Sequence, residues 1–416
     1  MAAISLWLES EAGKPEMKRS IAMCFALFVV AGCGQSALPN YRANPHAPGS
    51  VARVERVGWY PAIVMRALFW YASLPESVPV SEGIQLYRIS YWSRLGDGKP
   101  ALLSGLLALP TEGDLRGTVL YMHGTHTSRE DSVSNPAQEG VLVAGAFAGG
   151  GYLLAAPDLS GQGISHAPQP YFVNSSTIEQ TLDFLRAVQT VAHDLGRPWN
   201  ANLYILGFSQ GANNAAVVQR ELERRADPAW HVRAGAGIAG PYNMADIALP
   251  LAMTGVAVSD STYLTNLALS YSAHYHHPLE SVMTPDMAAR ARILLDGEHT
   301  ADDTTKGMPR NPRELFTAEF LDAFDHKKPN WFIAAMRENE AYAWAPAALF
   351  RAYYGDKDVD ADPRNSKFLM QEASRRGGHV EAIDVGAQDH TGTVFHAVPR
   401  IRRWFDALSA DTAVSH

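Results

Sequence analysis

One serine stands in a motif that can turn its hydroxyl into a nucleophile. The motif, Gly207-Phe208-Ser209-Gln210-Gly211, directly follows the apolar run 203–206 and directly precedes a helical pattern from Ala212. A strand, a sharp turn and a helix in this order are the context of a nucleophile elbow, in which the turn strains the serine backbone and exposes the hydroxyl. Glycine on either side tolerates the close approach that the turn needs. The sequence therefore predicts Ser209 as the nucleophile of a serine hydrolase.

A serine nucleophile needs a histidine base, and a carboxylate must hold that base in one tautomer. After a nucleophile elbow, the acid and then the histidine follow along the chain. Gly355-Asp356-Lys357-Asp358 comes directly after the apolar run 348–354, and the fourth residue of this turn is the expected acid. We therefore predict Asp358 as the triad acid, with Asp356 and Asp360 as neighbouring alternatives.

The expected base follows the last apolar run, 380–385. His390 stands after a short loop and opens a final helical pattern, and Gly392 leaves room beside it. His379 precedes the run and would lie at the far end of its strand, whereas His396 falls inside the helix and is expected to be structural. We predict His390 as the general base.

The negative charge that develops during acyl transfer needs two backbone N–H donors, and losing one such donor raises the barrier by about 3 kcal/mol. One donor is expected from Gln210, the residue after the nucleophile. The other is expected from Thr125 in the segment His123-Gly124-Thr125, which follows the apolar run 117–122. These two amides are the predicted oxyanion hole.

Short apolar runs that alternate with helical patterns must position these residues. After an expected hairpin over 84–108, the runs are 117–122, 152–156, 203–206, 232–239, 348–354 and 380–385. Continuous apolar runs indicate strands buried on both faces of a parallel sheet. The predicted class is α/β, with a mostly parallel central sheet flanked by helices. One helix is expected after Asn174, with a capping box at Ser176-Thr177-Ile178-Glu179.

The alternation stops over residues 242–345, where helical patterns continue almost without strand-like runs. We expect this segment to be a helical cap inserted between the sixth and seventh strands, and 51–241 with 346–416 to form the core. His274-Tyr275-His276-His277 lies in the cap without a clear partner carboxylate or cysteine set. Packing within a cap helix is therefore the better interpretation, and no metal site is predicted.

We expect residues 1–33 to be a signal and lipoprotein segment, because residues 18–33 are typical of an export signal. Lys18-Arg19 precede the short apolar run 21–30, and Val30-Ala31-Gly32-Cys33 resembles the bacterial lipobox, in which the cysteine is acylated. Gly34 after Cys33 favours the outer membrane, so we expect an exported lipoprotein of the cell envelope with a lipid anchor at Cys33. A cleaved signal with a secreted or periplasmic product is the alternative. Residues 1–16 are unlike a signal, which makes Met17 a candidate start, and 34–50 are expected to be a flexible tether.

Composition excludes several other classes. The chain has 416 residues, of which 47% are hydrophobic, and its net charge is −8 without a long basic run, so no nucleic-acid partner is expected. Both cysteines, Cys24 and Cys33, lie in the N-terminal segment. The remainder therefore has no thiol for a disulfide, for cysteine catalysis or for a thiolate metal site. No cofactor is predicted.

The residues together resemble the secretory lipase and esterase branch of the α/β-hydrolases, in a bacterial lipoprotein form. The motifs span about 117–405 and are His123-Gly124-Thr125, Ala156-Pro157-Asp158, Gly161-Gln162-Gly163-Ile164-Ser165, Pro170-Tyr171, the elbow, Glu338-Asn339, Trp344-Ala345-Pro346, Gly355-Asp356-Lys357-Asp358, Asn365-Ser366 and His390. The resemblance implies hydrolysis of carboxylic esters or lipids through an acyl-enzyme, without a cofactor. The family often has Val-Pro shortly after its acid, where this chain reads Val359-Asp360-Ala361-Asp362-Pro363.

Two other functions fit parts of the pattern. A peptidase or an acyltransferase would use the same triad, because the cap selects the leaving group and the acceptor. A binding lipoprotein without catalysis is a third possibility, which the intact order of elbow, acid and histidine disfavours. The sequence does not indicate the acyl-chain length, and therefore does not separate a lipase from a short-chain esterase.

Overall fold

The computed structural model describes residues 41, 44–72, 78–135 and 138–413. Cys33, the export signal and most of the predicted tether lie outside the described residues. The last two residues of that tether, Gly49 and Ser50, pair with the body, whereas 44–46 and 48 are exposed. The N–H of Gly49 donates to the carbonyl of Trp92 at 2.7 Å, and the N–H of Trp92 donates to the carbonyl of Ser50 at 2.9 Å.

Nine strands form one sheet in the order β1-β2-β3-β5-β4-β6-β7-β8-β9. The first three strands and β5 pair antiparallel, and all later neighbours pair parallel. The predicted hairpin is β2–β3. The strands are β1 (Val51–Tyr60), β2 (Ile84–Arg94), β3 (Pro100–Pro110), β4 (Thr118–Met122), β5 (Leu153–Pro157), β6 (Asn202–Phe208), β7 (His231–Ile238), β8 (Phe350–Tyr354) and β9 (Val380–Asp384).

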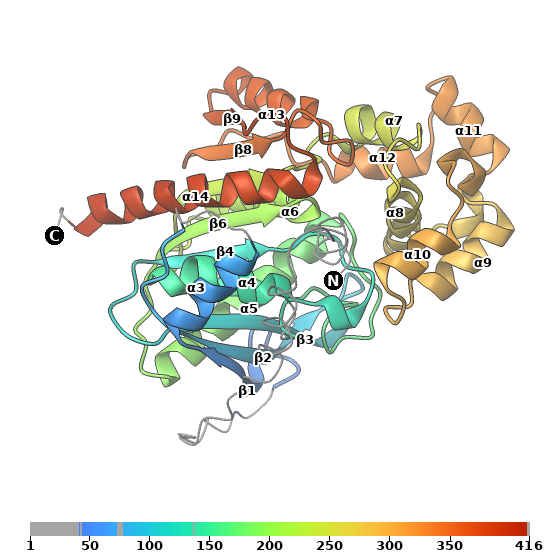
Figure 1. Cartoon of the computed structure of the whole chain (residues 1–416). Coiled ribbons are helices and arrows are strands. Elements are labelled where there is room, and N and C mark those ends of the chain that lie inside the picture. The colour runs from blue at the N-terminus through green and yellow to red at the C-terminus, as the bar shows by residue number, and fades with distance from the viewer. Residues whose placement is uncertain (1–40, 42–43, 73–77, 136–137, 414–416) are drawn as a thin grey trace, which may run out of the picture.

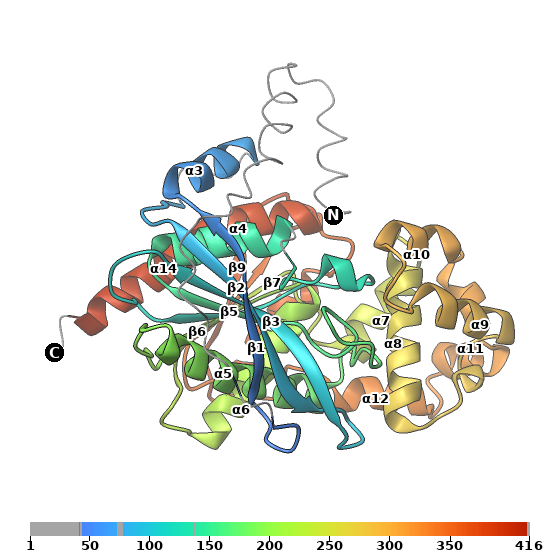
Figure 2. The same ribbon diagram turned by 90° about the horizontal axis from the view of Figure 1, so that it is seen from below.

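Helices cover both faces of the sheet, and each face has its own apolar core. Helices α5, α6 and α13 pack on one face, and α3, α4 and α14 pack on the other. Figure 2 shows α3 and α4 on one side of the strands and α5 and α6 on the other. The predicted α/β class is confirmed. These helices are α3 (Ala62–Tyr71), α4 (Gln138–Phe147), α5 (Asn174–Asp194), α6 (Gln210–Arg225), α13 (Arg364–Arg375) and α14 (His390–Ala413).

Two local features differ from the sequence prediction. Strand β1 was not predicted, because an edge strand that carries Arg53, Glu55 and Arg56 lacks a continuous apolar run. The capping box expected at 176–179 is wrong, because α5 already begins at Asn174. The N–H of Asn174 donates instead to the side-chain oxygen of Asn339 at 2.8 Å, a partner from the end of the cap. A residue so distant in sequence can satisfy a free N–H of the first turn as well as a local cap does.

The segment between β7 and β8 is helical and lies to one side of the body (Figure 1). Because β1 adds a strand, this insertion follows the seventh strand of the sheet. Its β pairing is confined to an isolated bridge between Met283 and Phe316. A third apolar core holds it together and includes 171–173 of the body. Its helices are α7 (Leu249–Ala252), α8 (Asp260–Tyr275), α9 (Pro285–Leu294), α10 (Ala301–Gly307), α11 (Ala318–Asp325) and α12 (Trp331–Glu338).

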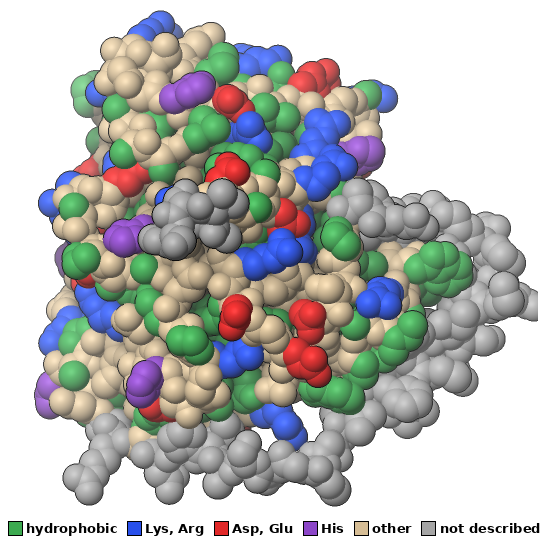
Figure 3. All heavy atoms as spheres, turned by 90° about the vertical axis from the view of Figure 1, so that its left-hand side faces the viewer, with side chains coloured by type: hydrophobic (Ala, Val, Ile, Leu, Met, Phe, Trp, Pro, Cys, Tyr) green, Lys and Arg blue, Asp and Glu red, His purple; other side chains and the backbone are tan. Residues whose placement is uncertain are grey.

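The surface away from the cap is mixed in character. Figure 3 shows this face, on which basic, acidic and hydrophobic side chains of the described residues are interspersed. Within the ranges that the structure describes, no helix combines the length and the apolar character needed to cross a membrane.

Candidate active site

The predicted nucleophile lies on a strained turn between β6 and α6. Ser209 has φ 54° and ψ −120°, a conformation that is costly for a residue with a side chain. The surrounding structure holds it there, since its N–H donates to the carbonyl of Ile238 at 2.8 Å. A Cβ on Gly211 would collide with the carbonyl oxygen of Met122, and one on Gly207 would collide with the backbone of Gly211. Both glycines of the motif are therefore required by packing, as a nucleophile elbow predicts.

The structure brings Ser209, His390 and Asp358 together from three separate loops. The hydroxyl of Ser209 lies 2.9 Å from Nε2 of His390 and can donate to it. Nδ1 of His390 donates to Oδ2 of Asp358 at 2.8 Å. This is the hydrogen-bond order that lets an imidazole take a proton from a serine while a carboxylate fixes its tautomer.

The acid and histidine loops support each other. The N–H groups of Asp356 and Lys357 donate to the carbonyls of Gly386 and Gln388, each at 3.0 Å, which joins the loop after β8 to the loop after β9. The second carboxylate oxygen of Asp358 accepts the N–H groups of Asp360 at 3.0 Å and Ala361 at 2.9 Å. The side chain of Asp358 is fully buried and oriented by three donors.

Burial and charge oppose each other at His390. Burial lowers the pKa of His390, but the negative charge of Asp358 and its hydrogen bond raise the pKa by more, with smaller contributions from Asp360 and Asp389. The net pKa is above the usual value for histidine. A base with this environment is neutral only above its raised pKa, so proton transfer from Ser209 is expected to improve as pH rises through that value.

Thr125 and Gln210 line the same pocket as Ser209. The preceding residues of the Thr125 loop are fixed, because Nδ1 of His123 donates to the carbonyl of Gly124 at 2.7 Å. Gln210 is the first residue of α6, so its N–H is one of the free donors at the positive end of the helix dipole. The two predicted oxyanion donors therefore flank the pocket that contains the nucleophile.

A buried polar cluster beneath this loop was not predicted. The ring of His126 stacks on that of His123 with centroids 4.7 Å apart, and its Nε2 donates to Glu139 at 2.8 Å. The hydroxyl of Tyr121 donates to the other oxygen of Glu139 at 2.6 Å. Burial raises the pKa of Glu139, but the charge and hydrogen bond of His126 outweigh burial and lower that pKa to about 2. The pKa of His126 is raised, because Glu139 outweighs the opposite effect of burial.

The loop that contains Thr125 and His126 is also linked to the cap. The carbonyl of His126 accepts from the side-chain amide of Gln169 at 3.2 Å, and the oxygen of Gln169 accepts from Asn266 of α8 at 3.0 Å. The side-chain oxygen of Thr125 is hydrogen-bonded to the hydroxyl of Tyr171 at 2.8 Å. The only signal for this cluster in the sequence was the histidine-rich spacing of 123–126. Glu139 and Asn266 gave no signal.

Of the alternatives to Asp358 and His390, Asp360 lines the pocket of Ser209, but its carboxylate accepts from Ser259 and Tyr263 and not from His390. Asp356, His379 and His396 are all exposed, and the hydrogen bonds to Ser209 and His390 do not involve them. In the cap, the ring of His277 stacks on Trp331 with centroids 4.4 Å apart. Across the described residues, no group of three or more His, Cys, Asp or Glu side chains is placed to hold a metal ion.

Comparison with known proteins identifies the fold. No protein-family model matches the chain, and neither does any curated protein. Among solved structures, a Legionella pneumophila protein thought to be a hydrolase matches with a TM-score of 0.79 and 21% identity, over 86% of this chain and 98% of that one. The rice cell wall degrading esterase LipA from Xanthomonas oryzae matches with a TM-score of 0.74 and 20% identity, over 88% and 97%. Candida antarctica lipase A matches with a TM-score of 0.65 and 13% identity, over 90% and 88%. The nine-stranded sheet with its helical insertion therefore has the α/β-hydrolase fold.

Proposed function

We propose that this protein is a serine carboxylic ester hydrolase that works through an acyl-enzyme. The observation that supports the proposal most strongly is the hydrogen-bonded chain Ser209–His390–Asp358, with the serine on a strained elbow. The structural neighbours include an esterase and a lipase, which agrees with this chemistry.

In the proposed reaction, Ser209 Oγ attacks the ester carbonyl carbon while Nε2 of His390 takes its proton. The tetrahedral intermediate then collapses, the C–O bond of the ester breaks, and His390 gives the proton to the departing alkoxide. Water repeats the sequence on the acyl-enzyme, again with His390 as base, and releases the acid. Asp358 keeps the proton on Nδ1 and stabilises the imidazolium.

The amides of Thr125 and Gln210 are the proposed donors to the oxyanion. Each such donor lowers the barrier by about 3 kcal/mol when it is aimed at the developing charge. The cluster of His126, Glu139 and Tyr121 is proposed to hold the Thr125 loop in place. No step needs a cofactor.

A labelling experiment tests the assignment of the nucleophile. A fluorophosphonate probe should label the wild-type protein, and p-nitrophenyl acetate should be hydrolysed. Ser209→Ala should lose both signals and remain folded by circular dichroism. Ser374→Ala, which removes an exposed serine hydroxyl on α13, is the matched control and should keep both. Labelling or hydrolysis that persists in Ser209→Ala would contradict the proposal.

We also propose that the protein is held at the cell envelope by a lipid on Cys33. The support is the lipobox-like sequence 30–33 alone. The full chain, expressed in a Gram-negative host with radioactive palmitate, should incorporate the label and fractionate with membranes, whereas Cys33→Ser should do neither. Wild-type protein without label would overturn the anchor and leave the proposed hydrolase activity untouched.

A further inference from the structure

The pocket beside Ser209 is mostly apolar and is built largely by the cap. It is partly open to solvent. Its apolar walls come from the cap residues Met244, Leu249, Leu264, Leu267 and Met336. Such a pocket suits the acyl part of an ester, because apolar surface is buried with a favourable free energy.

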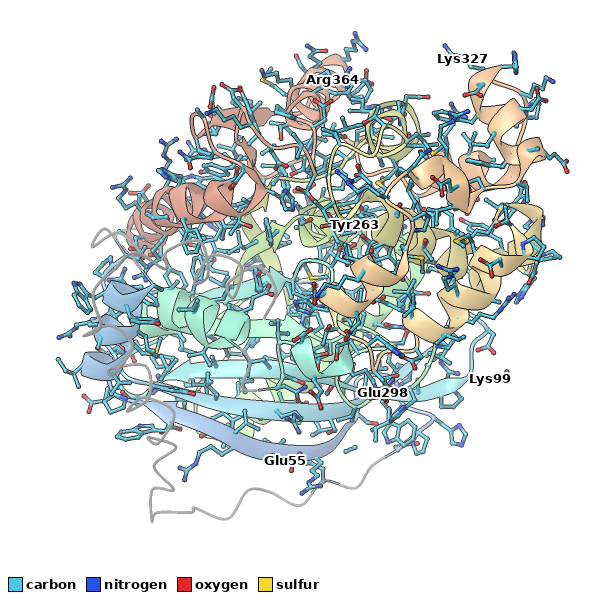
Figure 4. All side chains as sticks on the ribbon, turned by 45° about the vertical axis from the view of Figure 1, so that its right-hand side comes forward. Glu55, Lys99, Tyr263, Glu298, Lys327 and Arg364 are labelled. Carbon is cyan, nitrogen blue, oxygen red and sulfur yellow. The ribbon has the colours of Figure 1, made fainter. Side chains whose placement is uncertain are left out.

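Two carboxyl groups interrupt the apolar lining. Asp260, the first residue of α8, is 2% exposed, and its Oδ2 accepts the N–H of Ala257 at 2.9 Å. Oδ1 of Asp360 accepts the hydroxyl of Ser259 at 2.7 Å and that of Tyr263 at 3.4 Å. Tyr263 lies where α8 meets the body (Figure 4). Within the described part of the chain, the second oxygen of each carboxyl group accepts no hydrogen bond.

A third polar side chain in this pocket lacks partners. Gln210 is 1% exposed and lines the pocket next to the nucleophile. Neither the nitrogen nor the oxygen of its carboxamide has a hydrogen-bond partner among the residues that the structure describes. A buried amide without partners costs about 1–3 kcal/mol, so a ligand that supplies a partner gains that free energy.

The charge of Asp260 is poorly compensated. Burial raises the pKa of Asp260 to about 7, the nearby charge of Asp360 raises it further, and the N–H of Ala257 and the charge of Arg310 lower it. The guanidinium of Arg310 does not donate to the carboxylate. It donates to the carbonyls of Ala257 at 2.5 Å and Val256 at 3.2 Å.

These polar groups make the binding of an unsubstituted fatty acyl chain, the simplest acyl group, less favourable. An unsubstituted fatty acyl chain that filled the pocket would leave the second oxygens of Asp260 and Asp360 and the carboxamide of Gln210 without a hydrogen-bond partner. A buried carboxyl group without partners is unfavourable, and the cost reaches several kcal/mol when the group is ionised. An acyl group with a hydroxyl would bury the same apolar surface and also donate to a carboxylate oxygen.

We propose that this pocket selects acyl groups that carry a hydrogen-bond donor over unsubstituted fatty acyl chains of the same length. Asp260 determines this preference, because its second carboxylate oxygen can accept a hydrogen bond from the acyl group. The proposal rests on the proposed function, because it assigns the acyl side of that same ester substrate.

The test compares matched pairs of esters. We would measure kcat/KM for p-nitrophenyl hexanoate and for its ω-hydroxy derivative, and for p-nitrophenyl butyrate and its β-hydroxy derivative. At pH 8, where Asp260 with its pKa of about 7 is mostly ionised, wild type should prefer the hydroxylated member of at least one pair by about tenfold, the effect of one hydrogen bond to a charged group. Asp260→Leu should abolish that preference by raising activity on the plain ester and lowering it on the hydroxylated ester.

Two further variants keep the test interpretable. Asp260→Asn retains an acceptor for the N–H of Ala257 and should fold even if Asp260→Leu does not; it should reduce the preference severalfold. Asp302→Asn changes an exposed aspartate of α10 and should leave the preference unchanged. Equal hydrolysis of both members of each pair by wild type, or an unchanged preference in both Asp260 variants, would overturn the proposal.

The outcome can be separated from failure of the proposed function. p-Nitrophenyl acetate has only a methyl group on its carbonyl and reports on the triad alone. Hydrolysis of acetate that depends on Ser209, without any preference between paired esters, refutes only the selection by Asp260. A protein that hydrolyses none of the esters refutes the proposed function, and with it this inference.

Discussion

Asp358→Asn should separate the proposed role of Asp358 as triad acid from the stability of its loop. In the wild type, one carboxylate oxygen accepts the N–H groups of Asp360 and Ala361, and the other accepts Nδ1–H of His390. An asparagine of the same shape should keep its side-chain oxygen toward the two backbone N–H groups. The reverse orientation would place its NH₂ group, which is also a donor, against both of them. Its NH₂ group then faces Nδ1 of His390. That nitrogen must become the acceptor, and the ring proton moves to Nε2.

The size of the effect follows from this change of tautomer. With a proton on Nε2, His390 cannot accept the proton of Ser209, so the general base is lost. The expected decrease in kcat is about 10⁴-fold, or about 5 kcal/mol of barrier. The free energy of unfolding should change by less than about 2 kcal/mol, since the two backbone hydrogen bonds survive.

Hydrolysis of p-nitrophenyl butyrate across a pH series, together with thermal unfolding, measures both quantities. Burial lowers the pKa of His390 and Asp358 raises it by more. Without the carboxylate the effect of burial remains, so the residual activity should rise at lower pH than in wild type. Asp356→Asn, in the exposed neighbour, is the control. Activity of Asp358→Asn within tenfold of wild type, or an equal loss in the control, would refute the reasoning.

Three further predictions follow from contacts around the site. Glu139→Gln should lower the free energy of unfolding at pH 7 by about 3 kcal/mol. The pKa of Glu139 lies at about 2 instead of 4.5, and each unit of pKa shift corresponds to about 1.4 kcal/mol. This free energy belongs to the pair of Glu139 and His126 and is counted once. This difference from wild type should be complete from about pH 5 up to the raised pKa of His126, where that ring loses its charge, and should vanish toward pH 2. Urea denaturation between pH 2 and pH 7 checks it, and a difference that does not change with pH would contradict the prediction. Gly211→Ala places a Cβ against the carbonyl of Met122, so both the melting temperature and kcat should fall, and an unaffected kcat would count against the elbow packing. Gln169→Ala removes the link between the cap and the His126 carbonyl, so kcat should fall about fivefold with little change in stability; an effect on KM alone would contradict a positioning role.

The convergence of Ser209, His390 and Asp358 could be predicted because each residue has a local signal. Ser209, Asp358 and His390 each come within five residues of the end of an apolar run, and in a parallel sheet the ends of such strands meet at one edge. Ser209 and His390 are 181 positions apart in the sequence. Their proximity could nevertheless be predicted, because it required only that the strands before them be recognised. The class of the sheet was predictable for the same reason.

The remaining features depend on contacts without local signals. The start of α5 depends on Asn339, which lies 165 positions away. The ion pair of His126 with Glu139 forms only once α4 packs on the sheet, and Asp260 approaches Asp360 only once the cap docks on the loop after β8. Polar residues of these types are common on surfaces, so their sequence positions alone did not distinguish them from solvated residues.

The central claim is that Ser209 Oγ becomes covalently acylated during turnover. Rapid acid quench of the wild-type protein with excess p-nitrophenyl butyrate, followed by peptide mass spectrometry, tests this claim most directly. The proposed mechanism predicts a butyryl group on the peptide that contains Ser209, and its absence in Ser209→Ala. A butyryl group on another residue that persists in Ser209→Ala and turns over at the catalytic rate would contradict it.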